Sequence, residues 1–308
     1  MNKIVERIEK KIGSPGTVEK LADRLSNSEI NSLFMEIFKK KSQRLTSSEI
    51  LFQFQNNRFV FPAVVNPVSY KEFEIDWLKS AERIGFTSIQ LSPLTQFGTC
   101  SSVAPVDQNN IVSAIRGTEI VSDATNVLAL NIACEFRKEK QNRPIKYCTT
   151  HRHVRAQSIN NPLFSAHFGL FCMVTGGYDT GNFSFEIENL KEHINFYLNQ
   201  LLSIFGSKDL ILKIEVEDKN ENLNYKLKEQ LNNIRNDIKI IFIKMEDENN
   251  YYQLCRFKIY LNYKNNEVNL ADRGLVDWTQ RLLQNKKHRY LISAVGLELI
   301  YKLNEGLT

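Results

Sequence analysis

The sequence lacks long apolar segments. None of its apolar runs approaches the roughly 18 residues that a helix needs to span a bilayer, and the stretch from Met1 to Arg7 holds no apolar core of the signal-peptide kind. The sequence therefore shows neither the membrane-spanning run of a membrane protein nor the signal peptide of an exported one. We therefore expect a cytoplasmic protein that has no membrane partner.

Cysteine is also scarce. Five cysteines, an odd number, lie far apart in the 308 residues: Cys100, Cys134, Cys148, Cys172 and Cys255. Thiols in a chain without an export signal are reduced by default, so we expect no disulfide framework. Cys100 follows Gly98 in a turn that could expose a nucleophilic thiol. No base accompanies Cys100 in the sequence, which favours an unreactive thiol.

Neither sign of charge is in large excess. The net charge of +5 permits a nucleic-acid partner but does not require one. The basic run from Lys39 to Lys41 with Arg44 could contact phosphates, but the helix dipole also favours lysines in a last helical turn, and we favour this second interpretation. The composition, 42% hydrophobic and 24% charged, is typical of an ordinary globular protein and excludes disordered and collagen-like chains.

Residues 1–56 have the pattern of helices. Apolar residues recur at helical spacing from Val18 to Leu25 and again from Ile30 to Phe38. The segments Ser26 to Glu29 and Thr46 to Glu49 have the form of capping boxes, which begin helices. We predict a small N-terminal helical appendage over residues 1–56.

Residues 57–308 alternate between strand and helix patterns. We predict strands at Phe59–Val65, Ser88–Leu91, Ile111–Ile115, Ile145–Thr149, Phe168–Val174, Leu210–Val216, Ile238–Ile243, Cys255–Tyr263, Glu267–Leu270 and Tyr290–Ala294. We predict helices at Tyr70–Ile84, Val127–Phe136, Leu190–Ile204, Glu221–Ile234, Trp278–Asn285 and Leu297–Leu303. Because strands and helices do not alternate strictly, this pattern favours an α+β fold with an antiparallel sheet.

A basic cluster follows the strand predicted at Ile145–Thr149. Arg152 and Arg155 lie on one short segment, and Phe168 comes after a loop. The planar arginine fork binds two oxygens of a phosphate or carboxylate, and an aromatic ring can stack on a base. The clustered setting of Arg152 favours ligand contact over a plain surface position, whereas both interpretations of Arg155 have equal support. Phe168 lies on a predicted strand, which favours a core position over stacking.

Cys148, His151 and His153 have a spacing that suggests zinc ligands. On a strand, however, His151 and His153 share one face while Cys148 points to the other. Zinc requires ligands that converge on one point. We therefore expect no metal site.

Small and polar residues gather in the middle of the chain, at residues 98–102, 105–110 and 116–119. The last of these segments contains Arg116 and Glu119. Such residues could line a ligand site. They could equally form a solvated loop whose Gly, Pro, Asn and Asp residues serve turns, and both interpretations remain open.

Three segments, in order along the chain, resemble the motifs of class II aminoacyl-tRNA synthetases. Residues 84–93, which end at Pro93, resemble motif 1. Residues 152–157, Arg-His-Val-Arg-Ala-Gln, resemble motif 2, and residues 296–298, Gly-Leu-Glu, resemble motif 3. The similarity is greatest to the histidyl-tRNA synthetase group, which includes a non-catalytic relative, the regulatory subunit of ATP phosphoribosyltransferase. Further residues resemble that group's substrate-binding segments: Asp123, Tyr251, Tyr252, Phe257, Gly274 and Asp277.

This resemblance extends over residues 70–303 and implies a class II synthetase-like core across residues 57–308. The implied fold is an antiparallel sheet flanked by helices, with motif 1 at the interface of a homodimer. The resemblance, with the residue chemistry above, gives a set of candidate ligand-binding residues: Arg152, Arg155, Arg116, Glu119, Gln157, Phe168, Tyr252 and Glu298. Of these, Arg152 is the candidate catalytic residue.

The sequence also departs from the family at positions that carry its chemistry. Leu299 stands where the family has an arginine that contacts ATP, and Val154 replaces a glutamate that helps to hold the nucleotide. Residues 131–133, Asn-Ile-Ala, replace a substrate-reading arginine-proline-glutamate run, and Asp247 aligns with a catalytic arginine. The loss of one such arginine can cost on the order of 10³ in rate. We therefore expect no standard aminoacylation.

Two functions are consistent with these observations. In the first, the chain has lost aminoacylation and serves as a small-ligand-binding or regulatory subunit, with an amino-acid-like or nucleotide ligand and a possible partner protein. In the second, it is an ATP-dependent ligase that activates an amino acid or another carboxylate as an adenylate, with ATP and Mg²⁺ as cofactors. The sequence ends at the helix after motif 3, so we expect no anticodon-binding domain and no tRNA binding.

Overall fold

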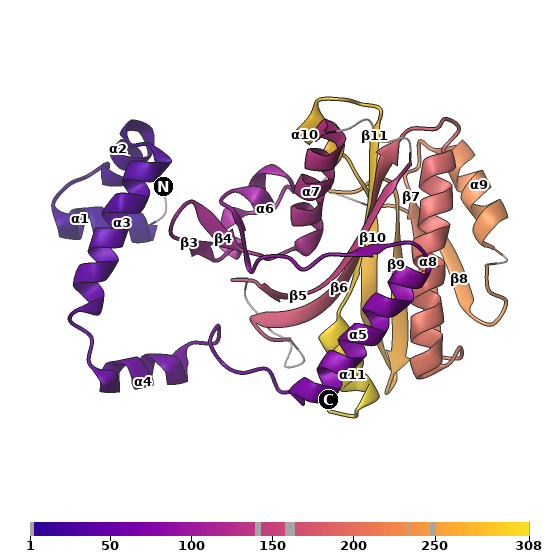
Figure 1. Cartoon of the computed structure of the whole chain (residues 1–308), viewed down its shortest axis with the longest axis horizontal. Coiled ribbons are helices and arrows are strands. Elements are labelled where there is room, and N and C mark those ends of the chain that lie inside the picture. The colour runs from indigo at the N-terminus through magenta and orange to yellow at the C-terminus, as the bar shows by residue number, and fades with distance from the viewer. Residues whose placement is uncertain (1–2, 139–142, 158–163, 233, 247–250, 308) are drawn as a thin grey trace.

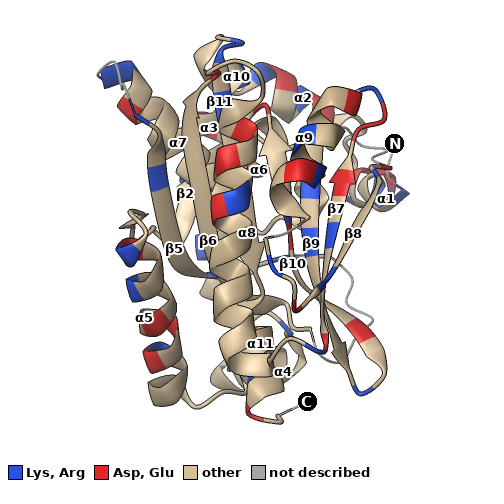
Figure 2. Cartoon of the chain, turned by 90° about the vertical axis from the view of Figure 1, so that its right-hand side faces the viewer, with Lys and Arg blue, Asp and Glu red and all other residues tan. Residues whose placement is uncertain are grey.

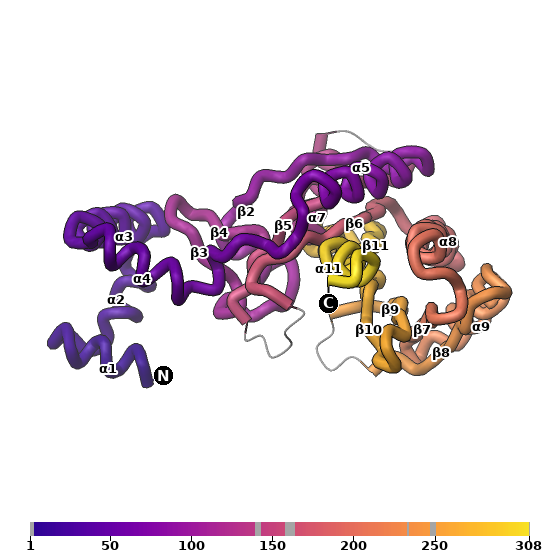
Figure 3. The backbone as a smooth tube through the Cα atoms, turned by 90° about the horizontal axis from the view of Figure 1, so that it is seen from below, coloured from indigo at the N-terminus to yellow at the C-terminus, as the bar shows by residue number. Residues whose placement is uncertain are grey.

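The computed structural model of the chain describes residues 3–138, 143–157, 164–232, 234–246 and 251–307. An N-terminal arm of four helices lies at one end of the long axis, and an eight-stranded sheet with helices on both faces forms the rest (Figures 1 and 3). A small three-stranded sheet lies between the arm and the large sheet. No helix in the described part of the chain is long and apolar enough to cross a membrane.

The arm consists of α1 (Lys3–Ile12), α2 (Thr17–Arg24), α3 (Asn27–Ser42) and α4 (Ser47–Asn56). Both predicted capping boxes are present, because Ser26 exchanges hydrogen bonds with Glu29, and Thr46 does so with Glu49. The arm buries almost nothing. Among the described residues of its four helices, Glu9 alone is buried. Sequence-local signals therefore form these helices without a core of their own.

The large sheet has the order β1-β5-β6-β11-β10-β9-β7-β8. Its strands are β1 (Thr87–Ser88), β5 (Ile145–Val154), β6 (His167–Tyr178), β7 (Leu210–Val216), β8 (Lys239–Lys244), β9 (Gln253–Tyr263), β10 (Asn266–Val276) and β11 (His288–Val295). The central neighbours pair antiparallel, whereas the edge pairs β1–β5 and β7–β8 are parallel. This arrangement confirms the predicted α+β sheet flanked by helices.

The second sheet and the helices complete the core. The small sheet contains β2 (Leu94–Gln96), β3 (Ser113–Ala114) and β4 (Thr118–Ile120) in the order β2-β4-β3. The helices are α5 (Pro67–Arg83), α6 (Thr99–Ser102), α7 (Ala124–Lys138), α8 (Ser184–Phe205), α9 (Glu221–Leu231), α10 (Trp278–Leu283) and α11 (Leu297–Asn304), with a 3-10 turn, η1, at Gln108–Asn110.

The alternation of β6 divides the core into two layers. Phe171 and Met173 face α5, α8 and α11, whereas Cys172 and Val174 face α7 and α10. Both sets are fully buried, as expected for a central strand covered by helices on each face. The sheet thus carries its loops, and with them any ligand site, at its ends.

Three sequence predictions are wrong. The segment predicted as a strand at Phe59–Val65 is an irregular linker, because most of its side chains are exposed and no strand in the described part of the chain pairs with it. The strands predicted at Ser88–Leu91 and Ile111–Ile115 shrink to the two-residue strands β1 and β3. In each case β-branched residues suggested a strand, but a strand forms only where a neighbour supplies hydrogen bonds.

Candidate ligand-binding site

A cavity of about 210 Å³ opens at the ends of β5 and β10, beside the start of α7. It is lined by Cys100, Val106, Asn110, Ile111, Ser122, Asp123, Arg155, Gln157, Tyr251 and Arg273. The lining combines two guanidinium groups and one carboxylate with aliphatic and aromatic side chains. A mostly apolar hollow with a few convergent polar groups is the usual form of a small-molecule site.

Arg273, on β10, is the least satisfied charged group of this cavity. Its side chain is 16% exposed, and its Nε has no hydrogen-bond partner among the described residues. Its guanidinium lies 3.8 Å from Asp123 Oδ2 and 3.5 Å from the Tyr252 hydroxyl, and both separations are at or beyond the limit of a hydrogen bond. A buried charge is costly unless it is well paired. Arg273 is therefore ready to bind an anionic group.

Asp123 is held at the start of α7. Its Oδ1 accepts hydrogen bonds from the backbone N–H and the hydroxyl of Thr125, at 2.9 and 2.7 Å. Burial alone would raise the pKa of this carboxyl, but the guanidinium groups of Arg273 and Arg155 outweigh burial and hold the pKa below its usual value. The cavity therefore presents a fixed negative charge between two positive ones.

His153 supports this arrangement from β5. Its Nε2 accepts a hydrogen bond from the Ala124 backbone N–H at 2.8 Å, so the ring proton is on Nδ1, which donates to the His151 carbonyl at 3.0 Å. Burial lowers the pKa of His153 to about 3. The ring is therefore neutral near pH 7 and acts as a structural link between β5 and the start of α7.

Arg155 also lines the cavity, directly after the end of β5. Its Nε donates to the Ser122 carbonyl at 3.0 Å, and its guanidinium lies 5.2 Å from the centre of the Phe168 ring. The Phe168 ring is also held in place by stacking with His153, with 6.0 Å between the ring centres. Phe168 thus supports an arginine of the cavity, and its predicted stacking on a ligand base stays a prediction.

Cys100 lines the cavity but is not arranged as a nucleophile. Burial raises the pKa of its thiol to about 11. The Sγ atom lies 2.9 Å from the Ser122 hydroxyl and 3.3 Å from the Asn126 amide nitrogen. A thiol in this setting stays protonated at neutral pH, and its surroundings agree with an unreactive side chain.

Arg152, the leading candidate from the sequence, lies outside the residues that line the cavity. Its Nη2 donates to Glu298 Oε2 at 2.8 Å, and its Nη1 donates to His167 Nδ1, also at 2.8 Å. Glu298 is 3% exposed and also binds Lys302 and the backbone N–H of Gly169. The two predicted ligand residues Arg152 and Glu298 therefore meet each other, in an ion pair that joins β5 to α11.

Arg116 and Glu119 belong to the loop region beside the small sheet. Glu119 is buried, and its carboxylate accepts hydrogen bonds from the backbone N–H groups of Gly98 and Cys100 and from the Gln108 amide. The Arg116 side chain is exposed, and its backbone N–H donates to Asn31 of the arm. Of the three polar segments, residues 98–102 and 105–110 contribute side chains to the cavity lining. Glu119, from the third segment, holds these two in place through its hydrogen bonds. Of the four charged candidates Arg152, Arg155, Arg116 and Glu298, Arg155 alone lines the cavity within the described residues.

Two other predicted residues lie at the cavity. Gln157 is part of its lining, and the Tyr252 hydroxyl lies next to the lining residue Arg273. The neighbouring Tyr251 faces the cavity and packs edge-on against Trp278 at 5.7 Å. Asp247, which aligns with the family's catalytic arginine, lies outside the described residues.

Arg273 was not predicted from the sequence, and Asp123 was not among the predicted ligand residues. A signal for Arg273 exists, because an Asp272-Arg273 pair interrupts an otherwise apolar strand that runs from Leu270 to Val276. Charged residues inside such a strand need partners or a function. Asp123 was noted for its resemblance to a substrate-binding segment, and it proves to be the central carboxylate of the cavity.

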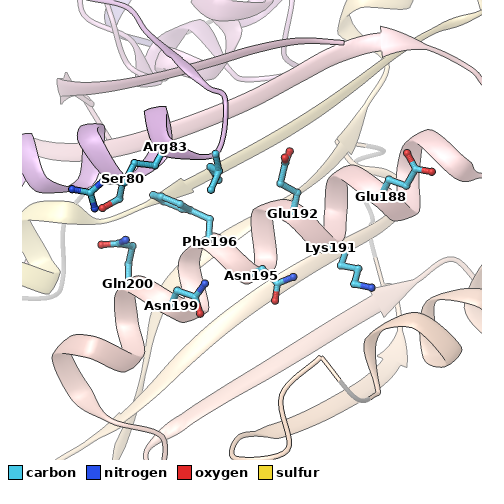
Figure 4. Close-up of a pocket in the computed structure, with 10 residues that line it drawn as sticks. Ser80, Arg83, Glu188, Lys191, Glu192, Asn195, Phe196, Asn199 and Gln200 are labelled. Atoms are coloured by element: carbon cyan, nitrogen blue, oxygen red, sulfur yellow. The ribbon is translucent and has the colours of Figure 1, made fainter. Parts of the chain in front are cut away.

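A larger groove of about 540 Å³ lies on the outer surface, between α5 and α8 (Figure 4). Figure 2 shows these two helices in front of the large sheet. Glu188, Lys191, Glu192, Asn195 and Asn199 extend from α8 along it (Figure 4). Its charges alternate in sign, Glu192 already pairs with Lys146, and its aromatic floor, Phe196, is 5% exposed. These features are typical of a solvated helix face, so the smaller cavity is the better candidate site.

The two family positions that changed have apolar surroundings. Leu299, in place of an arginine that contacts ATP, packs against the main core cluster. Val154, in place of the nucleotide-holding glutamate, is half-buried at the end of β5, where its N–H donates to the Val121 carbonyl. Within the described residues, no three His, Cys, Asp or Glu side chains are grouped closely enough to hold a metal ion.

No protein-family model and no curated protein matches this sequence. Solved structures, however, share its fold. A histidyl-tRNA synthetase from S. aureus superposes with a TM-score of 0.60 at 15% identity, over 79% of this chain and 68% of that one. A protein from Bacillus halodurans is described as an ATP phosphoribosyltransferase regulatory subunit/histidyl-tRNA synthetase. It superposes with a TM-score of 0.62 at 14% identity, over 80% of this chain and 82% of that one.

A third structure, a putative threonyl-tRNA synthetase from Aeropyrum pernix, gives a TM-score of 0.61 at 14% identity, over 77% of this chain and 59% of that one. At such low identity the similarity concerns the fold. The chain therefore has the fold of the class II synthetase core, and the resemblance inferred from its motifs is confirmed at that level.

Proposed function

We propose that the chain is a synthetase-fold protein that binds a small amino-acid-like ligand without activating it. The observation that carries this proposal is the mostly buried guanidinium of Arg273, which lies loosely beside Asp123 in a cavity that Arg155 also lines. An amino acid carries a carboxylate for the arginines and an ammonium group for the aspartate. The cavity thus matches a zwitterion in charge.

Size supports the same ligand class. The cavity of about 210 Å³ is smaller than the roughly 300 to 1,000 Å³ of sites for drug-sized ligands. Val106, Ile111 and Tyr251 supply an apolar wall that would contact a side chain. A free amino acid or a similar small acid therefore suits the cavity better than a nucleotide.

The surrounding charges support the proposed loss of adenylation. Arg152 is paired with Glu298, and Leu299 is packed into the core. Catalysis of phosphoryl-type chemistry depends on charges positioned around the reacting phosphate. ATP with Mg²⁺ is required only by the ligase alternative. In the proposed role, the chain is a cytoplasmic regulatory or ligand-sensing subunit, and motif 1, residues 84–93, contributes to a homodimer.

Calorimetry with a panel of amino acids tests this proposal. We expect binding of one amino acid or a close analogue, and we expect Arg273→Met to weaken binding at least about tenfold, because a charge-assisted hydrogen bond in a buried site contributes about 1.5 to 3 kcal/mol. The exposed Arg143 supplies a matched control, Arg143→Met, which should leave affinity unchanged.

Pyrophosphate exchange with ATP, measured with the same panel, separates the two functions. We expect no exchange with any amino acid. Exchange that depends on an amino acid would replace this proposal with the ligase alternative. Absence of binding for every amino acid at millimolar concentration would contradict both the ligand class and the role assigned to Arg273.

A further inference from the structure

The N-terminal arm exposes more apolar surface than a monomer in water usually carries. Among the described residues between Ile4 and Phe54, fourteen large apolar side chains are exposed. With about half of each exposed and roughly 150 Å² or more per side chain, the arm leaves on the order of 1,000 Å² of apolar surface uncovered. The largest apolar patch on a typical monomer is about 300 to 600 Å², and larger patches mark interaction sites.

Helix α3 carries the most continuous part of this surface. The apolar residues along one side of it, which we call the α3 stripe, are Ile30, Leu33, Phe34, Ile37 and Phe38. Phe34 and Phe38 are 43% and 54% exposed, and their ring centres lie 6.5 Å apart. A stripe at this spacing is the face with which a helix packs on a partner. No residue of α3 is buried, so the rest of the described chain does not cover the α3 stripe.

The attachment of α3 to the rest of the chain uses one edge of the stripe. The Asn31 side chain accepts hydrogen bonds from the N–H groups of Arg116 and Gly117, at the turn between β3 and β4, at 2.8 and 3.2 Å. Figures 1 and 3 both place α3 at one end of the molecule, with the small sheet between it and the large sheet. Leu33 lies about 200° around the helix from Asn31, because each residue turns the helix by about 100°. The Leu33 edge of the stripe therefore faces away from this attachment.

The charges beside the stripe make α3 complementary to an antiparallel copy of itself. Glu29 and Lys40 are close to three helical turns apart, so both lie along the Leu33 edge of the stripe. The midpoint between them falls between Phe34 and Met35, which is also the middle of α3. A two-fold axis at this midpoint places Glu29 of one helix beside Lys40 of the other, and it does so twice.

The remaining charges of α3 are consistent with the same arrangement. Glu36 and Lys39 lie on the side of the helix away from the stripe, and Glu36 is 4.0 Å from Lys39 and 3.7 Å from Lys40. Such exposed contacts within one helix contribute little. Lys41 continues the stripe at its C-terminal end, where an antiparallel partner presents its first turn with Glu29. A parallel pair would instead place Lys40 and Lys41 beside the same lysines of the partner.

We propose that α3 of one copy packs antiparallel on α3 of a second copy, so that the two arms cover each other's apolar stripes. A two-fold contact of one surface with itself is closed, because each stripe is covered by the other. Two arms with on the order of 1,000 Å² of uncovered apolar surface each can supply the roughly 1,200 to 2,000 Å² that a stable interface buries. The pairing involves neither α5 nor the motif 1 segment, and it does not require a bound ligand.

Crosslinking between two differently tagged full-length chains tests the proposal. One chain carries Asn27→Cys and the other Lys41→Cys, both with Cys134→Ser, which removes the exposed native cysteine. Antiparallel pairing brings positions 27 and 41 together at each end of the contact, so we expect a bis-maleimide reagent to join the chains. In the matched control, Lys39→Cys replaces Lys41→Cys, because Lys39 is also exposed and has the same charge but lies on the far side of α3.

We expect at least about fivefold less product from the control, because a helix with its side chains is about 10 Å across. Circular dichroism of each variant checks that the helices remain. Equal yields from the two pairs of chains, or no product from either, would overturn the proposal.

Charge variants of the same crosslinking pair test the register. Lys40→Glu in both chains places a second carboxylate beside Glu29, so we expect the yield to fall at least about threefold, and to fall less at high salt. Adding Glu29→Gln removes this repulsion while keeping the capping box, which accepts glutamine, and should restore most of the yield. Lys39→Glu, which also lies beside Glu36, is the control and should leave the yield unchanged. A yield that ignores Lys40→Glu, or that falls equally with Lys39→Glu, would refute the antiparallel pairing.

Discussion

Arg152 and Arg273 both lie on strands of the same sheet, but their surroundings give them different roles. Arg152 is half exposed and makes close contacts with Glu298 and His167. Arg273 is mostly buried, and the nearest carboxylate oxygen among the described residues, on Asp123, is 3.8 Å away. A well-paired arginine mainly stabilises the fold, whereas a loosely paired, mostly buried arginine can still form hydrogen bonds with a ligand. These contacts favour a structural role for Arg152, and its ligand contact stays a prediction of the motif resemblance.

Replacing Arg152 tests this assignment. We expect Arg152→Ala to lower the free energy of unfolding by about 1 to 2 kcal/mol, because Glu298 keeps Lys302 and the Gly169 N–H as partners and because the arginine is partly exposed. Chemical denaturation of both proteins measures the loss. If Arg152→Ala kept full stability but abolished ligand binding, Arg152 would be a ligand contact, as its motif position suggests.

At the scale of elements, the close pairing of β10 with β9 fixes the backbone position of Arg273. The ladder between β9 and β10 shifts register between Gly274 and Leu275, directly after Arg273. A Cβ atom on Gly274 would lie 2.5 Å from the Cys255 carbonyl oxygen and 2.7 Å from Arg256 Cβ. A Cβ atom essentially never lies within 3.0 Å of another non-bonded heavy atom, so the strand approaches its neighbour this closely only because residue 274 is glycine.

Gly274→Ala should therefore displace β10. We expect a loss of about 2 kcal/mol or more in the free energy of unfolding, and a weaker ligand affinity than in the wild type, because Arg273 moves with the strand. Thermal unfolding and calorimetry measure the two effects. Gly296→Ala is the control, since its Cβ would lie 3.3 Å from the nearest side-chain atom and its φ is −69°. Equal effects of both substitutions would contradict this account.

The linker between the arm and α5 is a second element with a defined position. The Arg58 side chain donates to the carbonyls of Ala156 and Gln157, just after β5, and His167 donates from Nε2 to the Phe61 carbonyl. The same histidine accepts a hydrogen bond from Arg152. The irregular linker is therefore tied to the motif 2 segment, and it connects the arm to the surroundings of the candidate site.

At the scale of the whole molecule, two neutral histidines join the layers of the core. His193 on α8 bonds to Thr175 of β6 at 2.9 Å and to Ser293 of β11 at 2.6 Å. His153 joins β5 to α7. Burial lowers the pKa of each ring to about 3. Both rings therefore stay neutral in the native state under conditions in which they would be protonated in the unfolded chain.

This difference predicts the pH dependence of stability. A histidine in the unfolded chain has a pKa of about 6.5, so as pH falls below that value the unfolded state binds protons that the native state does not, and stability decreases. From pH 7.5 to pH 5 we expect a loss of about 2 kcal/mol for each of His153 and His193. Urea denaturation at both pH values measures it.

His193→Gln isolates one of these contributions, because glutamine retains hydrogen-bonding groups but does not titrate. Between pH 7.5 and pH 5, the free energy of unfolding of the variant should fall by about 2 kcal/mol less than that of the wild type. An unchanged difference between pH 7.5 and pH 5 would show that His193 is protonated equally in the folded and unfolded states.

Much of the fold follows from local sequence patterns. Capping boxes at Ser26 and Thr46 and apolar spacing on α3 identify the arm's helices, because these signals act within one or two helical turns. The long buried strands were also predicted, since apolar runs such as residues 170–174 in β6 are continuous. Short strands such as β1 and β3 were not predicted accurately, because a two-residue strand is defined by its neighbour rather than by its own sequence.

The sequence by itself determined the class II synthetase-like core, the loss of the motif 3 arginine at Leu299, and Arg155 as a candidate ligand residue. Only the tertiary structure decided that Arg273 and Asp123, 150 residues apart in the chain, share one cavity, while Arg152 and Glu298 neutralise each other. Local sequence fixes helices and strands. Which charges meet depends on sheet order and register, which the packing of the whole chain sets.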